Sequence, residues 1–271
     1  MDIGMARPTG HRLRWFASLA FGLCLGLPAF AAEETPAAPL PPLSPACDVP
    51  ANDIALPAPL PNVVALLRTS RTIHILAIGS SSTIGIGASA GVKSYPAQLG
   101  AILQHALKDV DVEIVNRGIA GEVAETTAER IRNEVALSKP DLVLWQLGTN
   151  DAISRVPPED FDRTVRETVQ WLKGDGIDVV LVGLQYTSRL AKDASYLAIR
   201  EVLRKIAADE NVLYVRRYDA MRFITLTRAN LPLLASDNFH LNDLGYQCMA
   251  EHVAHAVIVG LFVKRFRPAT Q

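Results

Sequence analysis

The sequence predicts a three-layer α/β domain built around a five-stranded parallel sheet. Two observations lead to this prediction. Short, continuous apolar runs alternate with segments of helical length and periodicity, and the alternation repeats five times after Arg71. Runs of this kind are typical of parallel strands that helices cover on both faces. Repeated strand–helix units in one chain favour a sheet between two helical layers.

The expected strands lie at 73–78, 112–115, 142–147, 179–184 and 212–215. The expected helices lie at 95–107, 124–137, 159–172 and 194–208, and an amphipathic helix from about 243 to 262 ends the domain. A short helix capped by Asn62 is expected over 62–67. Ligands of such sheets bind beyond the carboxyl ends of the strands, so the loops after the five strands are where a site is expected.

The N-terminal residues 1–31 have the features of a secretory signal peptide. Three arginines among the first 14 residues precede an uncharged apolar run, Trp15–Leu27, and Ala29-Phe30-Ala31 supplies the small-residue cleavage pattern. The apolar run is shorter than the ~20 residues of a membrane-spanning helix. We therefore expect export to the periplasm or the extracellular space, with no membrane span after cleavage.

Residues 32–61 are rich in Pro and Ala and have no periodic apolar pattern, which predicts an extended linker or tail before a domain at 62–271. The net charge of −1 provides no basic excess, so no nucleic-acid partner is expected. After signal removal Cys47 and Cys248 are the two remaining cysteines. An oxidising compartment permits a disulfide between them, and the alternative is two free thiols.

Four of the five loops contain residue types suited to nucleophilic catalysis. Ser81 stands two residues after Gly79 at a strand-to-helix turn, and Asp237 precedes His240 by three residues in the fifth loop. A serine nucleophile needs a base, and the base needs an acidic group that orients it. The second and third loops contribute Gly121 and Asn150, whose N–H groups can face an oxyanion. Each segment alone is also an ordinary turn sequence.

Taken together and in this order, the four segments resemble those of the SGNH hydrolases, also called GDSL esterases and lipases. That family's patterns are G-D-S-x-T, N-x-x-x-x-G, G-x-N-D and D-x-x-H. The matching segments here are Gly79–Thr83, Asn116–Gly121, Gly148–Asp151 and Asp237–His240. The resemblance covers roughly 73–263 and implies a flavodoxin-like fold. One position departs from the pattern, because Ser80 stands where the family has aspartate.

The resemblance implies a serine esterase that acts through an acyl-enzyme, without a metal ion or an organic cofactor. Ser81 would be the nucleophile, His240 the base and Asp237 its orienting acid. The oxyanion would be held by the backbone N–H groups of Ser81 and Gly121 and by the side-chain amide of Asn150. The spacing from Gly79 selects Ser81 among three consecutive serines, and the missing aspartate is expected to alter the site's stability or tuning.

Two other function classes stay open: an acyltransferase using the same triad, and a non-catalytic binding module of the envelope. The segment 85–90 fits the dinucleotide pattern G-x-G-x-x-A, but it comes too late after its strand. The expected partner is a small-molecule or envelope acyl ester. Residues 185–193 and 221–234 are expected to form the walls of the site, and short-chain esters, thioesters, lysophospholipids and O-acetylated glycans remain open as substrates.

Overall fold

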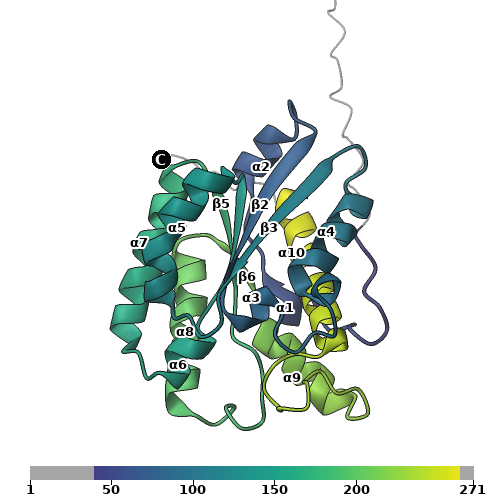
Figure 1. The fold of residues 1–271 in the computed structure, drawn as a ribbon, viewed down its shortest axis with the longest axis vertical. Helices are drawn as coiled ribbons and strands as arrows, with labels where there is room; N and C mark the ends of the chain where they lie inside the picture. Colours follow the sequence, from purple (N-terminus) through teal and green to yellow (C-terminus); the bar gives the residue numbers. More distant parts are fainter. Residues whose placement is uncertain (1–39, 263–271) are drawn as a thin grey trace, which may run out of the picture. The chain divides into compact units, whose positions relative to one another are not determined.

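The computed structural model describes residues 40–262, in which a sheet lies between two helical layers (Figure 1). The predicted signal peptide and the start of the Pro/Ala-rich segment lie outside these residues. Within the described range, no helix combines the length and the apolar character needed to cross a membrane. The three-layer α/β prediction is confirmed.

The sheet contains the five predicted parallel strands and one more. The parallel strands are β2 (Thr72–Gly79), β3 (Asp111–Gly118), β4 (Leu142–Gln146), β5 (Asp178–Val182) and β6 (Leu213–Val215). The sixth strand, β1 (Ala55–Leu56), pairs antiparallel with β6 and comes from the segment predicted to be a linker. The strand order is β1-β6-β5-β4-β2-β3, so the order reverses around β2.

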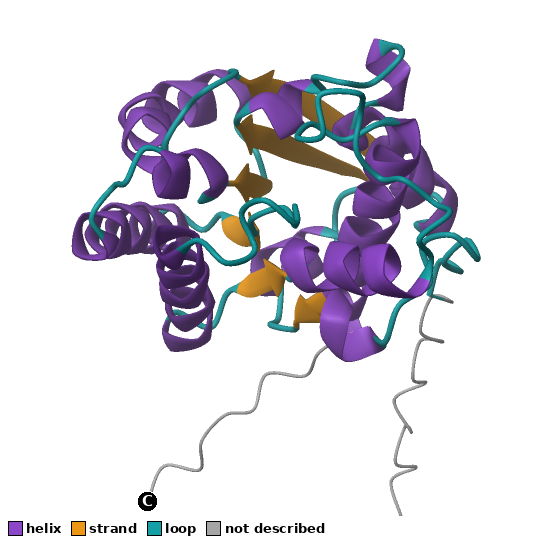
Figure 2. Ribbon diagram, turned by 90° about the horizontal axis from the view of Figure 1, so that it is seen from below, coloured by secondary structure: helices purple, strands orange, loops and turns teal. Residues whose placement is uncertain are grey.

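Helices cover both faces of the sheet (Figure 2). The helices α4 (Tyr95–Ala106) and α10 (Asp243–Phe262) pack together on one face, and α5 (Ala124–Ser138), α7 (Pro158–Gly174) and α8 (Ala194–Asp209) pack on the other. The shorter helices are α1 (Ala51–Ile54), α2 (Pro61–Leu66), α3 (Ser81–Ile84), α6 (Thr149–Ile153) and α9 (Arg217–Thr227), with a 3-10 turn at Gly91–Lys93.

Helix α9 was not predicted. It begins two residues after β6, and its β-branched residues Ile224, Thr225 and Thr227 have low helix propensity. The helix forms because Ala220, Met221 and Ile224 are buried in the core, so that tertiary packing overrides local preference.

The boundary predicted at residue 62 is wrong for residues 40–61, which belong to the folded domain. Cys47, Ile54 and Leu60 are buried in the core beside α10. Leu60 N–H donates to the Gly260 carbonyl, and His252 Nε2 lies 2.7 Å from the Cys47 carbonyl. Residues 40–61 thus form an N-terminal cover over α10. This cover explains why α10 is buried on most of its surface and is not the amphipathic helix expected.

The cap of α2 also differs from the prediction. Asn62 lies inside this helix, and its side-chain amide donates to Asp178 Oδ1 at 3.0 Å. The Asp178 Oδ2 atom accepts the backbone N–H groups of Asn62 and Val63, each at 2.9 Å. A carboxylate on β5, distant in sequence, therefore performs the capping that the prediction assigned to a local side chain.

A disulfide joins Cys47 to Cys248 on α10, with a Cα–Cα distance of 4.9 Å. This distance lies within the ordinary range for disulfides. The bond closes a loop across 201 positions of sequence, and it anchors the N-terminal cover to the helix that the cover buries.

We predict that Cys47→Ser lowers the free energy of unfolding by about 2–5 kcal/mol, because it removes a long cross-link and leaves a buried hydroxyl. Urea denaturation of oxidised protein, with and without reductant, measures this effect. Reductant should destabilise the wild type and leave the variant unchanged. Equal sensitivity of the two proteins to reductant would contradict the prediction.

Candidate active site

The predicted site residues gather at the carboxyl edge of the sheet, around the point where the strand order reverses. The turn after β2 carries Ser81, and the turn after the neighbouring strand β4 carries Asn150. The turn after β3, on the other side of β2, leads to Gly121. A reversal of strand order opens a crevice between diverging loops, where ligands of such folds bind.

The three consecutive serines have different surroundings. The Ser80 hydroxyl donates to Gln146 Oε1 at 3.0 Å, and Ser82 Oγ accepts a hydrogen bond from Arg217 at the same distance. Ser81 begins α3, and within residues 40–262 its hydroxyl has no hydrogen-bond partner. Ser81 is therefore the serine whose hydroxyl is left for another group.

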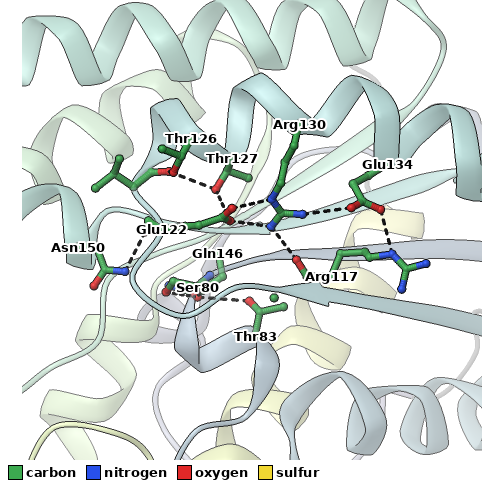
Figure 3. A network of polar contacts seen from close by, with 12 residues as sticks. Ser80, Thr83, Arg117, Glu122, Thr126, Thr127, Arg130, Glu134, Gln146 and Asn150 are labelled. Carbon is green, nitrogen blue, oxygen red and sulfur yellow. Dashed lines mark hydrogen bonds and ion pairs between the residues drawn. The ribbon is translucent and has the colours of Figure 1, made fainter.

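A buried glutamine, Gln146, holds the turn that contains Ser80, the residue found where the family pattern has aspartate (Figure 3). Besides the Ser80 hydroxyl, Gln146 Oε1 accepts the Ser80 backbone N–H at 3.1 Å and the Thr83 hydroxyl at 3.3 Å. A neutral amide on β4 thus fixes the turn on both sides of Ser81. This role could not be recognised in the sequence, because Gln146 lies within the predicted strand 142–147.

The fifth loop brings Asp237 and His240 together in a tight turn. Asp237 Oδ2 lies 2.6 Å from His240 Nδ1, and Asp237 Oδ1 accepts the backbone N–H groups of Phe239 and His240 at 2.9 Å each. The hydrogen bond from His240, followed by that from the Phe239 backbone, lowers the pKa of the Asp237 carboxyl. An ionised carboxylate at Nδ1 leaves Nε2 of the imidazole for other contacts.

The turn that follows Ser81 packs against this loop. The Ser81 carbonyl accepts the N–H groups of Gly85 and Ile86, both at 2.9 Å. At Gly87, with φ +94°, an added Cβ would lie 3.1 Å from His240 Cβ and 2.5 Å from the Leu241 carbonyl. Only glycine fits this approach. No direct hydrogen bond joins Ser81 Oγ to His240 among the described residues, and such contacts often tighten only when substrate binds.

The two predicted oxyanion loops are tied to each other. Asn150 Nδ2 donates to the Glu122 carbonyl at 2.8 Å, which leaves its second N–H for a ligand. Gly121, beside Glu122, has φ +82°. Asp151 accepts the N–H groups of Ala124 at 2.7 Å and Gly148 at 3.0 Å. Burial raises the pKa of Asp151, and its contacts are those of a loop-ordering residue.

An arginine on α5 fixes the backbone of the loop that contains Gly121 (Figure 3). Arg130 Nε and Nη2 each lie 2.6 Å from a carboxylate oxygen of Glu122, and Nη2 also donates to the Arg117 carbonyl at 2.7 Å. Glu134 joins the group through Arg117 and Arg130. The bidentate pair holds Glu122, whose carbonyl in turn holds Asn150. Sequence reasoning missed this support, because ordinary surface helices show the same charge pattern.

A pocket of 370 Å³ opens beside Phe239. Its lining is mixed in polarity and includes Ile153, Thr187, Arg189, Leu190, Asn238 and Phe239. Residues of the predicted wall 185–193 thus border the pocket. In the second predicted wall, 221–234, Met221 and Leu233 are buried in the core, whereas Leu226 is exposed.

The described residues contain no group of three or more His, Cys, Asp or Glu side chains arranged to hold a metal ion. The chemistry available here is that of a hydroxyl, an imidazole–carboxylate pair and N–H donors at one edge of a sheet. Such a set suits acyl transfer.

Comparison with known proteins identifies the family of the chain. Residues 46–262 match the non-GDSL lipase-like family. The chain belongs to this family. The matched range includes Cys47 and most of the N-terminal segment that covers α10.

Individual relatives are esterases. The chain is 28% identical to esterase TesA of Pseudomonas aeruginosa over 45% of its own length and 60% of that protein's, so it spans less than two thirds of this relative. It is 24% identical to an acetylxylan esterase of Geobacillus stearothermophilus over 64% of this chain and 81% of that one. A two-domain esterase active on acetylated mannans shares the fold, with a TM-score of 0.67, 17% identity and coverage of 82% of this chain and 60% of that one.

We predict that Arg130→Met increases amide hydrogen exchange in the segment 117–123 by about tenfold or more, since a charge-assisted bidentate contact is lost. Hydrogen exchange followed by mass spectrometry measures it. The control is Arg163→Met, which removes an exposed pair with Asp160 on α7 and should leave this segment unchanged. Unaltered exchange in the Arg130 variant would show that the loop is held by other contacts.

Proposed function

We propose that this protein is an exported serine esterase that hydrolyses small acyl esters through Ser81, His240 and Asp237. The observation that carries the proposal is the unpartnered Ser81 hydroxyl, which lies at the same sheet edge as a histidine already oriented by a carboxylate. The esterase relatives support the reaction class. The residue roles rest on geometry and on the order of the four segments.

In the proposed mechanism, His240 takes the proton of the Ser81 hydroxyl as Ser81 Oγ attacks the ester carbonyl carbon. Asp237 holds the imidazole and stabilises its protonated form. The negative charge on the carbonyl oxygen is met by the N–H groups of Ser81, Gly121 and Asn150. The C–O bond then breaks, the alcohol leaves with the proton from His240, and an acyl-Ser81 ester remains. Water activated by His240 hydrolyses that ester and regenerates the serine.

The pocket beside Phe239, which is lined by the residues flanking the proposed catalytic groups and by neither Ser81 nor His240, supports a small substrate with polar groups. Its 370 Å³ is near the lower end of the range for small-molecule sites. Hydroxyl, amide and guanidinium groups from Thr187, Asn238 and Arg189 line it together with apolar side chains. A lining of this kind suits short acyl esters of polyhydroxy compounds better than long-chain lipids. Relatives that act on acetylated xylan and mannan point to the same substrate class.

Export is supported by two independent features. The first 31 residues have the composition of a signal peptide, and the Cys47–Cys248 bond suits an oxidising compartment. Periplasmic or extracellular acyl esters, including O-acetylated envelope glycans, would then be within reach of the enzyme.

We predict that Ser81→Ala abolishes hydrolysis of p-nitrophenyl acetate, because the hydroxyls of the flanking Ser80 and Ser82 are both held in hydrogen bonds. Ser80→Ala is the matched control. It removes one hydrogen bond to Gln146 and leaves the Ser80 backbone N–H bond to the same oxygen, so it should retain activity. Steady-state kinetics of the two variants test this. Substantial turnover by the Ser81 variant would remove the nucleophile from the mechanism.

Activity is predicted to rise from acid to neutral pH as the base loses its proton. The lowered pKa of Asp237 keeps this carboxylate ionised across that range. Asp237→Asn should lower kcat by as much as about 10⁴, as loss of the orienting acid does in serine proteases. A profile of kcat/KM that stays flat from about pH 5 to about pH 8 would argue against a histidine base.

A further inference from the structure

A buried arginine beneath the site has no carboxylate partner within residues 40–262. Arg217 begins α9 and is 2% exposed. Its Nη2 donates to Ser82 Oγ at 3.0 Å and to Gln185 Oε1 at 2.8 Å, while Nε and Nη1 have no partner among the described residues. A buried, unpaired charge is expensive for a fold. The mechanism above makes no use of it.

Gln185, the second acceptor of Arg217, connects this arginine to the loop that carries the proposed base. Gln185 Nε2 donates to the Phe239 carbonyl at 3.0 Å, and Phe239 directly precedes His240. The Phe239 ring meets the imidazole edge to face, with 5.0 Å between ring centroids. The backbone of Gln185 is itself fixed, because its carbonyl accepts the Tyr196 hydroxyl at 2.6 Å.

These contacts form one continuous bridge across the site. It starts at Ser82, next to the proposed nucleophile, passes through Arg217 and Gln185, and ends at Phe239, next to the proposed base. The bridge is assembled from two helices, α3 and α9, and two loops that local sequence does not relate. All of its hydrogen bonds involve buried or partly buried groups, where such contacts are stronger than in water.

The charge of Arg217 is not neutralised by its neighbours. The ionisable groups around it are the tyrosines Tyr95, Tyr196 and Tyr246. Burial raises the pKa of Tyr95 and of Tyr246 to about 12, so both are neutral at physiological pH. Burial lowers the pKa of the Arg217 guanidinium, but a guanidinium keeps its proton even when buried. The positive charge therefore acts on the adjacent turn without a nearby counter-ion, in a medium of low dielectric.

We propose that Arg217 and Gln185 are positioning residues that set the approach of His240 to Ser81, and that the buried charge of Arg217 favours negative charge on the reacting oxygens. This inference rests on the proposed function. It differs from a purely structural role, because the bridge would affect kcat and the reactivity of Ser81 in every folded molecule and leave KM almost unchanged.

The test compares Arg217→Met with Arg217→Lys and with a matched control, Arg200→Met. Arg200 pairs with Asp219 at 2.5 Å and lies over the Tyr218 ring, and it too has a buried Nε without a partner. None of its hydrogen bonds reaches the Ser81 turn or the His240 loop. For each protein we would measure kcat and KM on p-nitrophenyl acetate and the rate of labelling by a fluorophosphonate, per folded molecule from circular dichroism.

We expect Arg217→Met to lower kcat and the labelling rate by about tenfold to a hundredfold, the usual effect of losing a charge-assisted hydrogen bond. KM should change by less than about twofold, since the contacts that bind the substrate equally in the ground state and the transition state are unchanged. Arg217→Lys should recover part of the loss, because it restores a positive charge and one donor. Arg200→Met should lose stability and keep its kcat.

A folded Arg217→Met protein with wild-type kcat and labelling rate would overturn the inference. If this variant does not fold, Gln185→Leu breaks the same bridge at its next link, and a wild-type kcat there would overturn it equally. Failure of the proposed function would look different, since the wild-type protein would then neither hydrolyse the ester nor react with the fluorophosphonate.

Discussion

The site depends on one buried amide oxygen, Gln146 Oε1. Three donors from the turn after β2 converge on it, two from Ser80 and one from Thr83. The turn therefore enters α3 with the Ser80 side chain directed to the sheet and the Ser81 hydroxyl left without a partner. A neutral acceptor at this position avoids placing a buried carboxylate beside an oxyanion site, where it would oppose the developing negative charge.

The fold class could be predicted from the sequence because its signal is local. Strands such as 142–146 are continuous apolar runs, and their burial on both faces follows from composition alone. The order of the four segments located the loops for the same reason, since carboxyl ends of parallel strands share one edge. What could not be predicted depends on contacts between distant segments: Gln146 with Ser80, Arg130 with Glu122, and Arg217 with Gln185.

The N-terminal cover of α10 is another feature that depends on contacts between distant segments and could not be predicted from local sequence. A Pro- and Ala-rich stretch lacks the periodicity of a helix or a strand, so composition favours a linker. Cys47, Ile54 and Leu60 are nevertheless buried, because α10 is too apolar on its outer side to face water. The apolar outer side of the helix must be covered, and the segment joined to it at Cys248 covers it.

The central claim is that Ser81 is an activated nucleophile in the setting of Asp237 and His240. Peptide mapping by mass spectrometry, after reaction of the purified protein with a fluorophosphonate, tests this directly. We expect one adduct, on Ser81, which is lost when His240 is replaced by alanine. An adduct on Ser80 or Ser82, or none on the folded protein, would contradict it.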